Sequence, residues 1–208
     1  MSDDPEVDDA YAMSSREEVK ALYRDWSHSY DIAFNEGQGY QLPREVATAF
    51  VAAGGQGPVL DIGAGTGLVG AALRHLGIAP IDGVDLSEDM LAVAGIKGDY
   101  RALTQADVLE PLSLMDAPYA GVVSAGTFTL GHVGPEALEN LLTVAAPDAV
   151  FVISVNTAHY ATAGFEGVLT ALGGRIRGLS FRDVRIYDDR ASEAHRNDMA
   201  RIVVFRKT

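Results

Sequence analysis

After Pro58 the sequence alternates between short apolar runs and stretches with helical periodicity, and this alternation limits the possible folds more than any other feature. The runs at 120–125 and 149–155 are apolar at nearly every position, which is typical of parallel strands buried on both faces. Such alternation predicts an α/β protein with a doubly wound, mostly parallel sheet and right-handed crossovers. The predicted strands span 59–62, 81–85, about 100–106, 120–125 and 149–155, and the predicted helices span about 15–31, 43–53, 67–76, 87–95, 135–146 and 161–172.

The two ends of the sequence differ from this centre. Residues 1–14 are acidic and lack periodicity, which predicts a disordered tail. Two strand-like stretches at 179–189 and 201–208, joined by a polar connection, predict an antiparallel closing hairpin. We therefore expect a single domain over residues 15–208, which divides into N-terminal helices (15–57), a ligand-binding core (58–156) and a C-terminal helix and hairpin (157–208).

The composition argues against several classes of function. A net charge of −13 disfavours a nucleic-acid partner, because such binding depends on Lys and Arg displacing counterions. The chain has no cysteine for thiolate chemistry, and its five histidines are scattered, so we expect no metal site. No apolar run approaches the roughly 20 residues that span a bilayer, and the acidic start is unlike a signal peptide. We expect a cytoplasmic protein without a membrane partner, either a monomer or a homodimer.

The stretch VLDIGAGTGLVG, residues 59 to 70, carries the strongest indication of a ligand. It contains G-x-G-x-x-G at Gly65, Gly67 and Gly70, the pattern of dinucleotide-binding loops, but Asp61 and Gly63 precede it. Glycines let the backbone approach a ligand closely, and the N-terminus of the following helix favours a negative group. A carboxylate at Asp61 favours a ligand with a cationic amine and no phosphate, such as S-adenosylmethionine. We expect Gly70 to let the helix pack on the sheet.

Two further acids stand at the ends of the next two predicted strands. Asp85 is suited to accept hydrogen bonds from ribose hydroxyls, which both nucleotide classes would require. Asp107 can accept the adenine amino proton while the Val108 N–H meets a ring nitrogen; the alternative is that Asp107 caps a loop. Leu86 and Met90, which follow Asp85, are further candidates for cofactor binding.

These residues resemble the motifs of the class I S-adenosylmethionine-dependent methyltransferases. Their first motif, acid-x-Gly-x-Gly-x-Gly, reads DIGAGTG here, and GVDLSEDML and QADV carry the acids of the next two strands. The resemblance covers about residues 15–155. It implies S-adenosylmethionine as the cofactor and a Rossmann-like seven-stranded sheet of order 3-2-1-4-5-7-6 with the seventh strand antiparallel. A weaker likeness, through YRDWSHSYD, GYQLP and IVVFRK, is to the methyltransferase-like proteins of the Williams–Beuren chromosomal region.

The resemblance also implies further contacts with the cofactor. Helices before the first strand often fold over it as a lid in this family, so Tyr30 is a candidate contact, although Tyr23, Trp26 and Tyr30 also fit the buried stripe of an amphipathic helix. The end of the fourth strand is expected to lie beside the methionine part of the cofactor. The candidates there and in the glycine loop are Ala64, Ala125, Gly126 and Phe128.

Three residues are candidates for a catalytic role in methyl transfer to a small-molecule acceptor. His132 follows the fourth strand, and His159 and Tyr160 follow the fifth, so all three belong to the edge where ligands bind in such sheets. A histidine titrates near neutral pH and can take a proton from a hydroxyl or an amine, although His132 can also simply order its own loop. Two other functions stay open at this point: a non-catalytic S-adenosylmethionine-binding module and an NAD(P)-dependent oxidoreductase.

Overall fold

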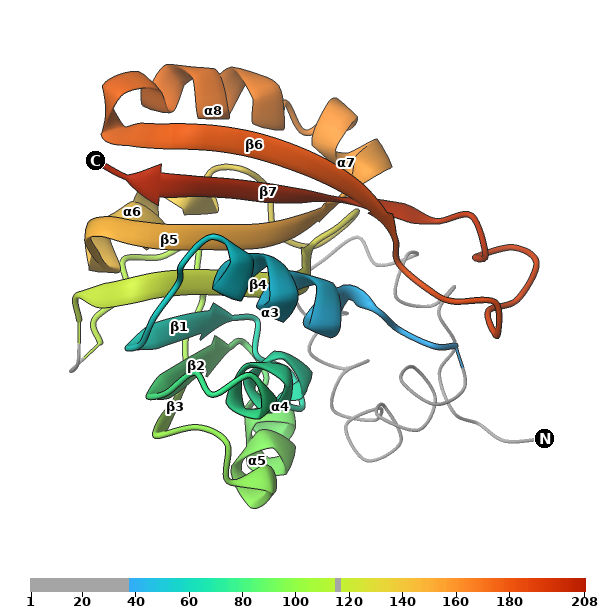
Figure 1. The fold of residues 1–208 in the computed structure, drawn as a ribbon, viewed down its shortest axis with the longest axis horizontal. Coiled ribbons are helices and arrows are strands. Elements are labelled where there is room, and N and C mark those ends of the chain that lie inside the picture. Colours follow the sequence, from blue (N-terminus) through green and yellow to red (C-terminus); the bar gives the residue numbers. More distant parts are fainter. Residues whose placement is uncertain (1–37, 115–116) are drawn as a thin grey trace.

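The computed structural model describes residues 38–114 and 117–208, and within them seven strands form one sheet (Figure 1). The strand order is β3-β2-β1-β4-β5-β7-β6, as the sequence predicts. Neighbouring strands are parallel from β3 to β5, and β7 is antiparallel to both β5 and β6. The strands are β1 (Val59–Ile62), β2 (Ile81–Asp85), β3 (Ala102–Gln105), β4 (Tyr119–Phe128), β5 (Ala145–Asn156), β6 (Ile176–Arg185) and β7 (Met199–Lys207).

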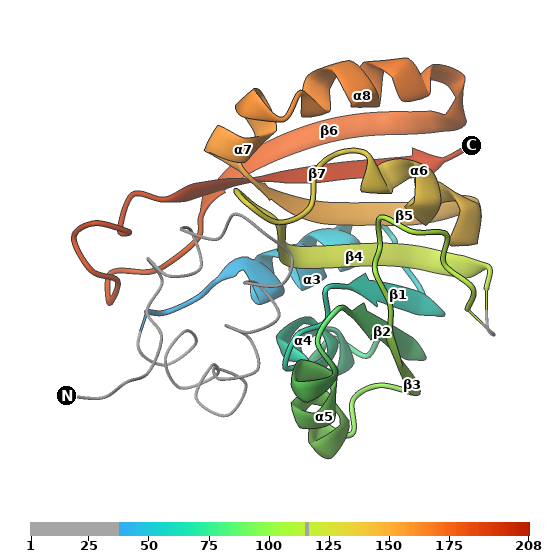
Figure 2. The same cartoon turned by 180° about the vertical axis from the view of Figure 1, so that it is seen from behind.

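Helices cover both faces of the sheet, which makes the doubly wound arrangement expected from the alternation (Figures 1 and 2). The helix α3 lies in front of the sheet in Figure 1, whereas α6 and α8 come to the front in the reverse view of Figure 2. Among the described residues, no helix is both long and apolar enough to cross a membrane. The helices are α3 (Leu42–Ala52), α4 (Leu68–His75), α5 (Glu88–Lys97), α6 (Ala137–Val144), α7 (Thr157–Thr162) and α8 (Phe165–Leu172), followed by a 3-10 turn (Gly173–Arg175).

Each face of the sheet has its own apolar core. On one face, Phe50 of α3 and Leu73 of α4 pack over strand residues such as Val152. On the other face, the rings of Phe151 and Phe205 stack with centroids 4.6 Å apart beneath α6 and α8. Burying each of these large side chains contributes about 1.5–3 kcal/mol to folding, so the two cores hold the strand ends in fixed positions.

Several predicted elements differ in their bounds from the observed ones, including the first hairpin strand, which is β6 over Ile176–Arg185 and not 179–189. The helix expected over 161–172 is two helices, α7 and α8, because Gly164 between them adopts the left-handed conformation with φ of 78°. The fourth strand continues to Phe128 and the fifth begins at Ala145, so both are longer than the apolar runs that predicted them. The predictions of a disordered tail over 1–14, a helix over 15–31 and a lid contact at Tyr30 concern residues outside those that the structure describes.

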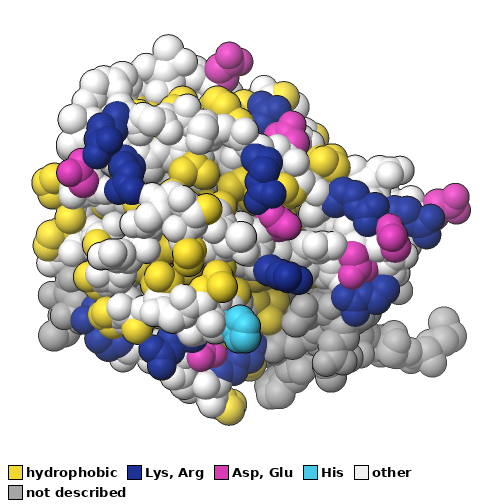
Figure 3. Space-filling view, in the orientation of Figure 1, with side chains coloured by type: hydrophobic (Ala, Val, Ile, Leu, Met, Phe, Trp, Pro, Cys, Tyr) yellow, Lys and Arg dark blue, Asp and Glu magenta, His cyan; other side chains and the backbone are white. Residues whose placement is uncertain are grey.

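Surface arginines gather on the C-terminal strands and their connection, and they lie beside carboxylates (Figure 3). Arg182 of β6 pairs with Glu45 of α3, Arg201 of β7 pairs with Asp183, and Arg190 pairs with Asp188. Such exposed pairs contribute at most about 1 kcal/mol each. They neutralise much of the positive charge that the sequence concentrates in this region.

Candidate active site

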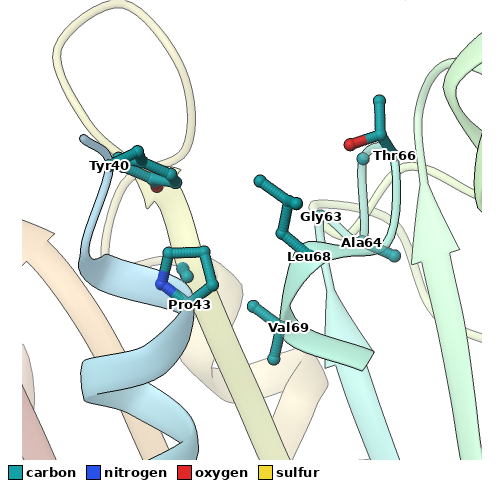
Figure 4. A pocket seen from close by; sticks show the side chains of 9 residues that line it. Tyr40, Pro43, Gly63, Ala64, Thr66, Leu68 and Val69 are labelled. Atoms are coloured by element: carbon teal, nitrogen blue, oxygen red, sulfur yellow. The ribbon is translucent and has the colours of Figure 1, made fainter. Parts of the chain in front are cut away.

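A small pocket lies between the start of α3 and the turn after β1 (Figure 4). Tyr40 and Pro43 form one wall, and Leu68 and Val69 point toward them from the other side. The pocket therefore opens at the carboxyl edge of the parallel strands, where ligands bind in such sheets. Its remaining lining residues are Gly63, Ala64, Gly65, Thr66 and Ala125.

The glycine turn follows β1 directly and has the conformation that the motif predicts. Gly63, Gly65 and Gly67 have φ values of 66°, 52° and 95°, which side chains rarely adopt. A Cβ at Gly63 would overlap Thr127 Oγ1, whereas a Cβ at Gly65 would meet no described atom within 4 Å. Gly63 is thus required by the protein's own packing, and Gly65 leaves open space in the pocket.

Asp85 supports the turn from the end of β2. Its Oδ2 accepts a hydrogen bond from the Gly65 N–H at 2.8 Å, and its Oδ1 accepts one from the Ser87 N–H at 2.9 Å. Burial raises the pKa of Asp85, although these N–H groups oppose the effect. The Ser87 hydroxyl accepts from the Met90 N–H and so caps α5. Leu86 is half-buried, and Met90 is almost fully buried.

Asp61 is not among the residues that line the pocket, and its contact with the cofactor stays a prediction. Its side chain is fully buried, and Oδ2 accepts a hydrogen bond from the Tyr100 hydroxyl at 2.6 Å. Among the described residues, Oδ1 of Asp61 has no hydrogen-bond partner. Burial raises the pKa of Asp61 to about 7; the Tyr100 hydroxyl lowers this pKa and the nearby charge of Asp85 raises it.

Gly70 differs from expectation, because it packs against Tyr100 rather than against the sheet. A Cβ at Gly70 would overlap the Tyr100 ring, and the Gly70 N–H donates to the Tyr100 hydroxyl at 3.0 Å. The second half of the apparent G-x-x-G pattern, from Gly67 to Gly70, is therefore explained by a tyrosine that stands just before β3.

Asp107 lies two residues beyond the end of β3 and caps a turn, since its Oδ1 accepts from the Leu109 N–H at 2.9 Å. This was the alternative role for the residue, and it leaves the adenine contact a prediction. The side chain of Val108 belongs to the apolar core, and its carbonyl accepts from Asn140. This turn follows β3, which pairs with β2, and the Ala106 N–H donates to the Asp85 carbonyl at 2.9 Å.

The end of β4 is joined tightly to β1. The hydroxyls of Ser124 and Thr127 both donate to the Ile62 carbonyl, at 2.7 and 3.0 Å. Gly126, with φ of 84°, donates its N–H to Ser154, and a Cβ on Gly126 would overlap the Tyr40 hydroxyl. Ala125 lines the pocket, and Gly126 lies next to Tyr40 in the pocket wall.

Phe128 does not stand at the pocket, so the prediction that it packs over the ligand is wrong. It is fully buried and makes an edge-on contact with Phe165 of α8. The pairing of β4 with β5 shifts register between Ser124 and Phe128, and this irregularity turns the ring into the core.

The structure brings His132 and His159 near each other, close enough for their charges to interact. Nδ1 of His132 lies 3.0 Å from the Leu130 carbonyl, and Nε2 of His159 lies 2.9 Å from the Val133 carbonyl. Because a carbonyl only accepts, each of these nitrogens carries the proton of the neutral ring, which leaves the lone pair on His132 Nε2. Burial lowers the pKa of His132, and the proximity of His159 lowers it further.

Tyr160 has a different surrounding from the one expected of a catalytic residue. It is almost fully buried, its ring stacks on Phe165, and the Arg201 guanidinium lies over it at 4.8 Å. Burial raises the pKa of the phenol, which disfavours the ionised form. The prediction of a catalytic Tyr160 is therefore replaced by a packing role between α8 and the C-terminal strands.

Tyr40 is a pocket residue that the sequence does not single out. Two backbone hydrogen bonds attach its segment to the connection between β6 and β7: Gln41 N–H to the Ile186 carbonyl and Asp188 N–H to the Gly39 carbonyl. The Tyr40 ring also packs on Tyr187, with centroids 5.9 Å apart. In the sequence, Tyr40 appears only within GYQLP, before the predicted second helix. Its position is fixed by contacts with Tyr187 and its neighbours, almost 150 positions away, which no local pattern indicates.

No group of three or more potential metal ligands occurs within residues 38–114 and 117–208. The site therefore combines a glycine turn, an acid that supports the turn from the next strand, the aromatic wall formed by Tyr40, His132 in the loop after β4 and His159 in α7.

Residues 59–148 match the family model described as a methyltransferase domain. The human methyltransferase-like protein 27 is 33% identical over 100 residues, which are 48% of this chain and 40% of that protein, so the match spans less than half of the curated relative. A TehB-like S-adenosylmethionine-dependent methyltransferase from Corynebacterium glutamicum superposes with a TM-score of 0.61 at 20% identity, over 90% of this chain and 99% of the other. Magnesium protoporphyrin IX methyltransferase from Synechocystis, solved with bound S-adenosylmethionine, gives a TM-score of 0.59 at 18% identity, over 81% and 79% of the two chains.

The strand order and the glycine turn give the chain the same fold as these solved methyltransferases. Its central residues, 59–148, match the methyltransferase domain.

Proposed function

We propose that this protein transfers a methyl group from S-adenosylmethionine to a small-molecule acceptor and releases S-adenosylhomocysteine. The observation that carries the proposal is the pocket over the glycine turn, in which Gly65 leaves open space and Asp85 holds the turn from the neighbouring strand. Gly63, Ala64, Gly65, Gly67 and Ala125 are proposed to bind the methionine part. Asp85, Leu86, Met90, Asp107 and Val108 are proposed to bind adenosine.

The residues present fit such a cofactor in charge as well as in shape. The start of α4 presents backbone N–H groups that suit a carboxylate, and the buried Asp61 places negative charge beneath the same turn. Asp85 has lone pairs beyond the two that accept from Gly65 and Ser87, and these suit ribose hydroxyls. When bound, the cofactor supplies a methyl group already activated by its sulfonium, so the protein has to orient the acceptor, exclude water and remove a proton.

The acceptor is proposed to bind above Tyr40, Gly126 and the loop that carries His132. We propose His132 as the general base, because its neutral tautomer has the lone pair on Nε2 and its lowered pKa keeps the ring neutral at physiological pH. His159 is the second candidate. We also propose the division of the domain into a cofactor-binding core over 58–156 and a C-terminal part over 157–208 that completes the sheet and, through the β6–β7 connection, the pocket wall.

Binding and turnover together test the function. Calorimetric titration is expected to show binding of S-adenosylhomocysteine, with NAD as the comparison ligand. Incubation with S-adenosylmethionine labelled on its methyl group and with fractions of small metabolites is expected to label a small acceptor. Binding of NAD without binding of S-adenosylhomocysteine would overturn the proposal, and binding without transfer to any fraction would leave a non-catalytic cofactor-binding protein.

Replacing Asp85 by alanine is expected to weaken S-adenosylhomocysteine binding by about 1–3 kcal/mol, because the ribose hydroxyls lose their acceptor. The matched control is Ser87→Ala, which removes the cap of α5 but leaves the carboxylate in place. It should lower the free energy of unfolding by about 1 kcal/mol and leave the affinity unchanged. Equal affinity losses in the two variants would instead assign Asp85 a purely structural role.

His132→Gln is expected to lower kcat by about 10²- to 10⁴-fold while S-adenosylhomocysteine binds as before. In the wild-type protein the rate should fall with decreasing pH only below the usual range of a histidine, since burial lowers the pKa at which His132 takes up its proton. His195→Gln, in the β6–β7 connection, is the control and should keep the wild-type pH profile. A His132→Gln variant with an unchanged rate and pH profile would exclude the base.

A further inference from the structure

Tyr100 makes a cluster of contacts that the motif of the family does not contain. It stands two residues before β3, yet its hydroxyl reaches under the glycine turn, where it donates to Asp61 Oδ2 at 2.6 Å and accepts from the Gly70 N–H at 3.0 Å. Its ring fills the space beside Gly70 and Gly83, where an added Cβ would collide with it or crowd it. One side chain therefore connects the end of β1, the first turn of α4 and the entry to β3.

We propose that Tyr100 is a positioning residue of the cofactor site, which fixes the Asp61 carboxylate and the first turn of α4 beneath the cofactor's amino-acid end. The proposal rests on the function proposed above. Asp61 is fully buried and does not contact solvent. Because a buried charge is only weakly screened, the Asp61 carboxylate can attract a cationic group on the other side of the glycine turn without touching it. Within the described residues, Oδ1 of Asp61 has no hydrogen-bond partner. A cationic group nearby would offset the cost of burying this oxygen.

The charged state of Asp61 depends on Tyr100. Burial raises the pKa of Asp61 to about 7, and the hydrogen bond from Tyr100 opposes that rise. The groups that face this pair are Asp85 at the end of β2, which raises the pKa of Asp61, and Asp99 beside Tyr100, which raises that of the phenol. From α4 the pair meets the Gly70 N–H, and β4 places Val123 opposite Asp61.

The sign of the effect on binding follows from these groups. A cationic ligand favours ionised Asp61, so binding should strengthen as pH rises through about 7 and release a proton below it. Without the Tyr100 hydroxyl, the pKa of Asp61 rises. At pH 7 about half of Asp61 is ionised in the wild-type protein, and only about a tenth would be ionised if its pKa rose by about one unit. The variant Tyr100→Phe should therefore bind S-adenosylhomocysteine about fivefold more weakly than the wild-type protein at pH 7 and should approach it at pH 9.

The comparison ligand is 5′-methylthioadenosine, which keeps the adenosine and the thioether but lacks the amino-acid end. Tyr100→Phe should bind it with wild-type affinity, because it has no ammonium group to attract. The matched protein control is Tyr119→Phe, which removes another tyrosine hydroxyl hydrogen bond to a buried carboxylate, that of Asp82 at 2.9 Å. Asp82 lies at the start of β2, away from the glycine turn at its other end. Tyr119→Phe should therefore leave the affinities for both ligands, and their pH dependence, unchanged.

Three outcomes decide the matter. Weaker binding of S-adenosylhomocysteine alone, with its pH midpoint raised, supports the positioning role. Equal weakening for both ligands, or wild-type binding of both, overturns it and leaves Tyr100 a packing residue. If the wild-type protein bound neither ligand, the proposed function itself would fail, and this inference with it.

A measurement on the unsubstituted protein covers the case in which Tyr100→Phe does not fold. The ¹³Cγ resonance of Asp61 should titrate near pH 7 without ligand and should remain that of an ionised carboxylate at pH 6 once S-adenosylhomocysteine is added. A resonance that kept the same titration midpoint with and without the ligand would contradict the coupling.

Discussion

Substitution of Gly63 by alanine should lower the free energy of unfolding by about 2–5 kcal/mol and abolish measurable cofactor binding. A side chain at a φ of 66° costs about 1–2 kcal/mol. The new Cβ would also overlap Thr127 Oγ1, and displacing that hydroxyl breaks its hydrogen bond to the Ile62 carbonyl, which adds about 1–3 kcal/mol. Urea denaturation measures the first effect and S-adenosylhomocysteine titration the second.

Two other glycines separate backbone strain from collision in this experiment. Gly65→Ala has a comparable φ of 52°, but its Cβ points into open space in the pocket, so it should cost about 1–2 kcal/mol of stability and still block the ligand. Gly164 lies before α8 and does not line the pocket, and a Cβ there would meet no described atom within 4 Å. Gly164→Ala should therefore show the cost of backbone strain alone and should bind S-adenosylhomocysteine as the wild-type protein does. A Gly63→Ala variant no less stable than Gly164→Ala would show that Thr127 yields without cost.

Replacing Arg101 by methionine should lower the free energy of unfolding by about 3–5 kcal/mol, since it leaves a buried carboxylate without its cation. Asp82 is only 4% exposed, and Arg101 donates to both of its oxygens, from Nε at 2.9 Å and from Nη2 at 2.6 Å. Tyr119 supplies one further hydrogen bond, which cannot balance a full charge. Chemical denaturation of the ligand-free protein gives the value.

Removing the charge as well should recover much of this loss. In the double variant Arg101→Met, Asp82→Asn, the buried group is neutral, so stability is expected to rise above that of Arg101→Met alone. Arg175→Met breaks an exposed pair with Glu139 and should cost no more than about 1 kcal/mol. Similar costs for Arg101→Met and Arg175→Met would mean that burial of Asp82 does not determine the strength of its pair.

The sequence predicted the alternation of strands and helices and the glycine turn, because both depend on local patterns. Unbroken apolar runs and helical periods determine the alternation, and the φ values near 60° at Gly63 and Gly65 require the residue type found there. The last strands were predicted from the same apolar runs, and the resemblance to the family supplied their order.

The features that the sequence did not predict depend on contacts between distant segments. Asp61 is covered by Tyr100, 39 positions away, and no local pattern marks Tyr100 as its partner. Strand alternation cannot locate Phe128, because the irregular pairing near Gly126 changes the direction of the residues beyond it. Tyr40 reaches the pocket only because its segment pairs with the β6–β7 connection, which lies at the other end of the sequence.

The Ile62 carbonyl accepts two hydrogen bonds, and this affects how the specificity for the methyl acceptor could be changed. Ser124 and Thr127 of β4 both donate to the carbonyl at the end of β1. The end of β4 and the glycine turn that follows β1 therefore cannot move independently of each other. New acceptors are therefore best sought by varying the surrounding pieces, the loop from Thr129 to Val133 and the connection that supports Tyr40. In a library for directed evolution, the residues of those two segments other than His132 would be varied, while His132 and the strand ends are kept constant.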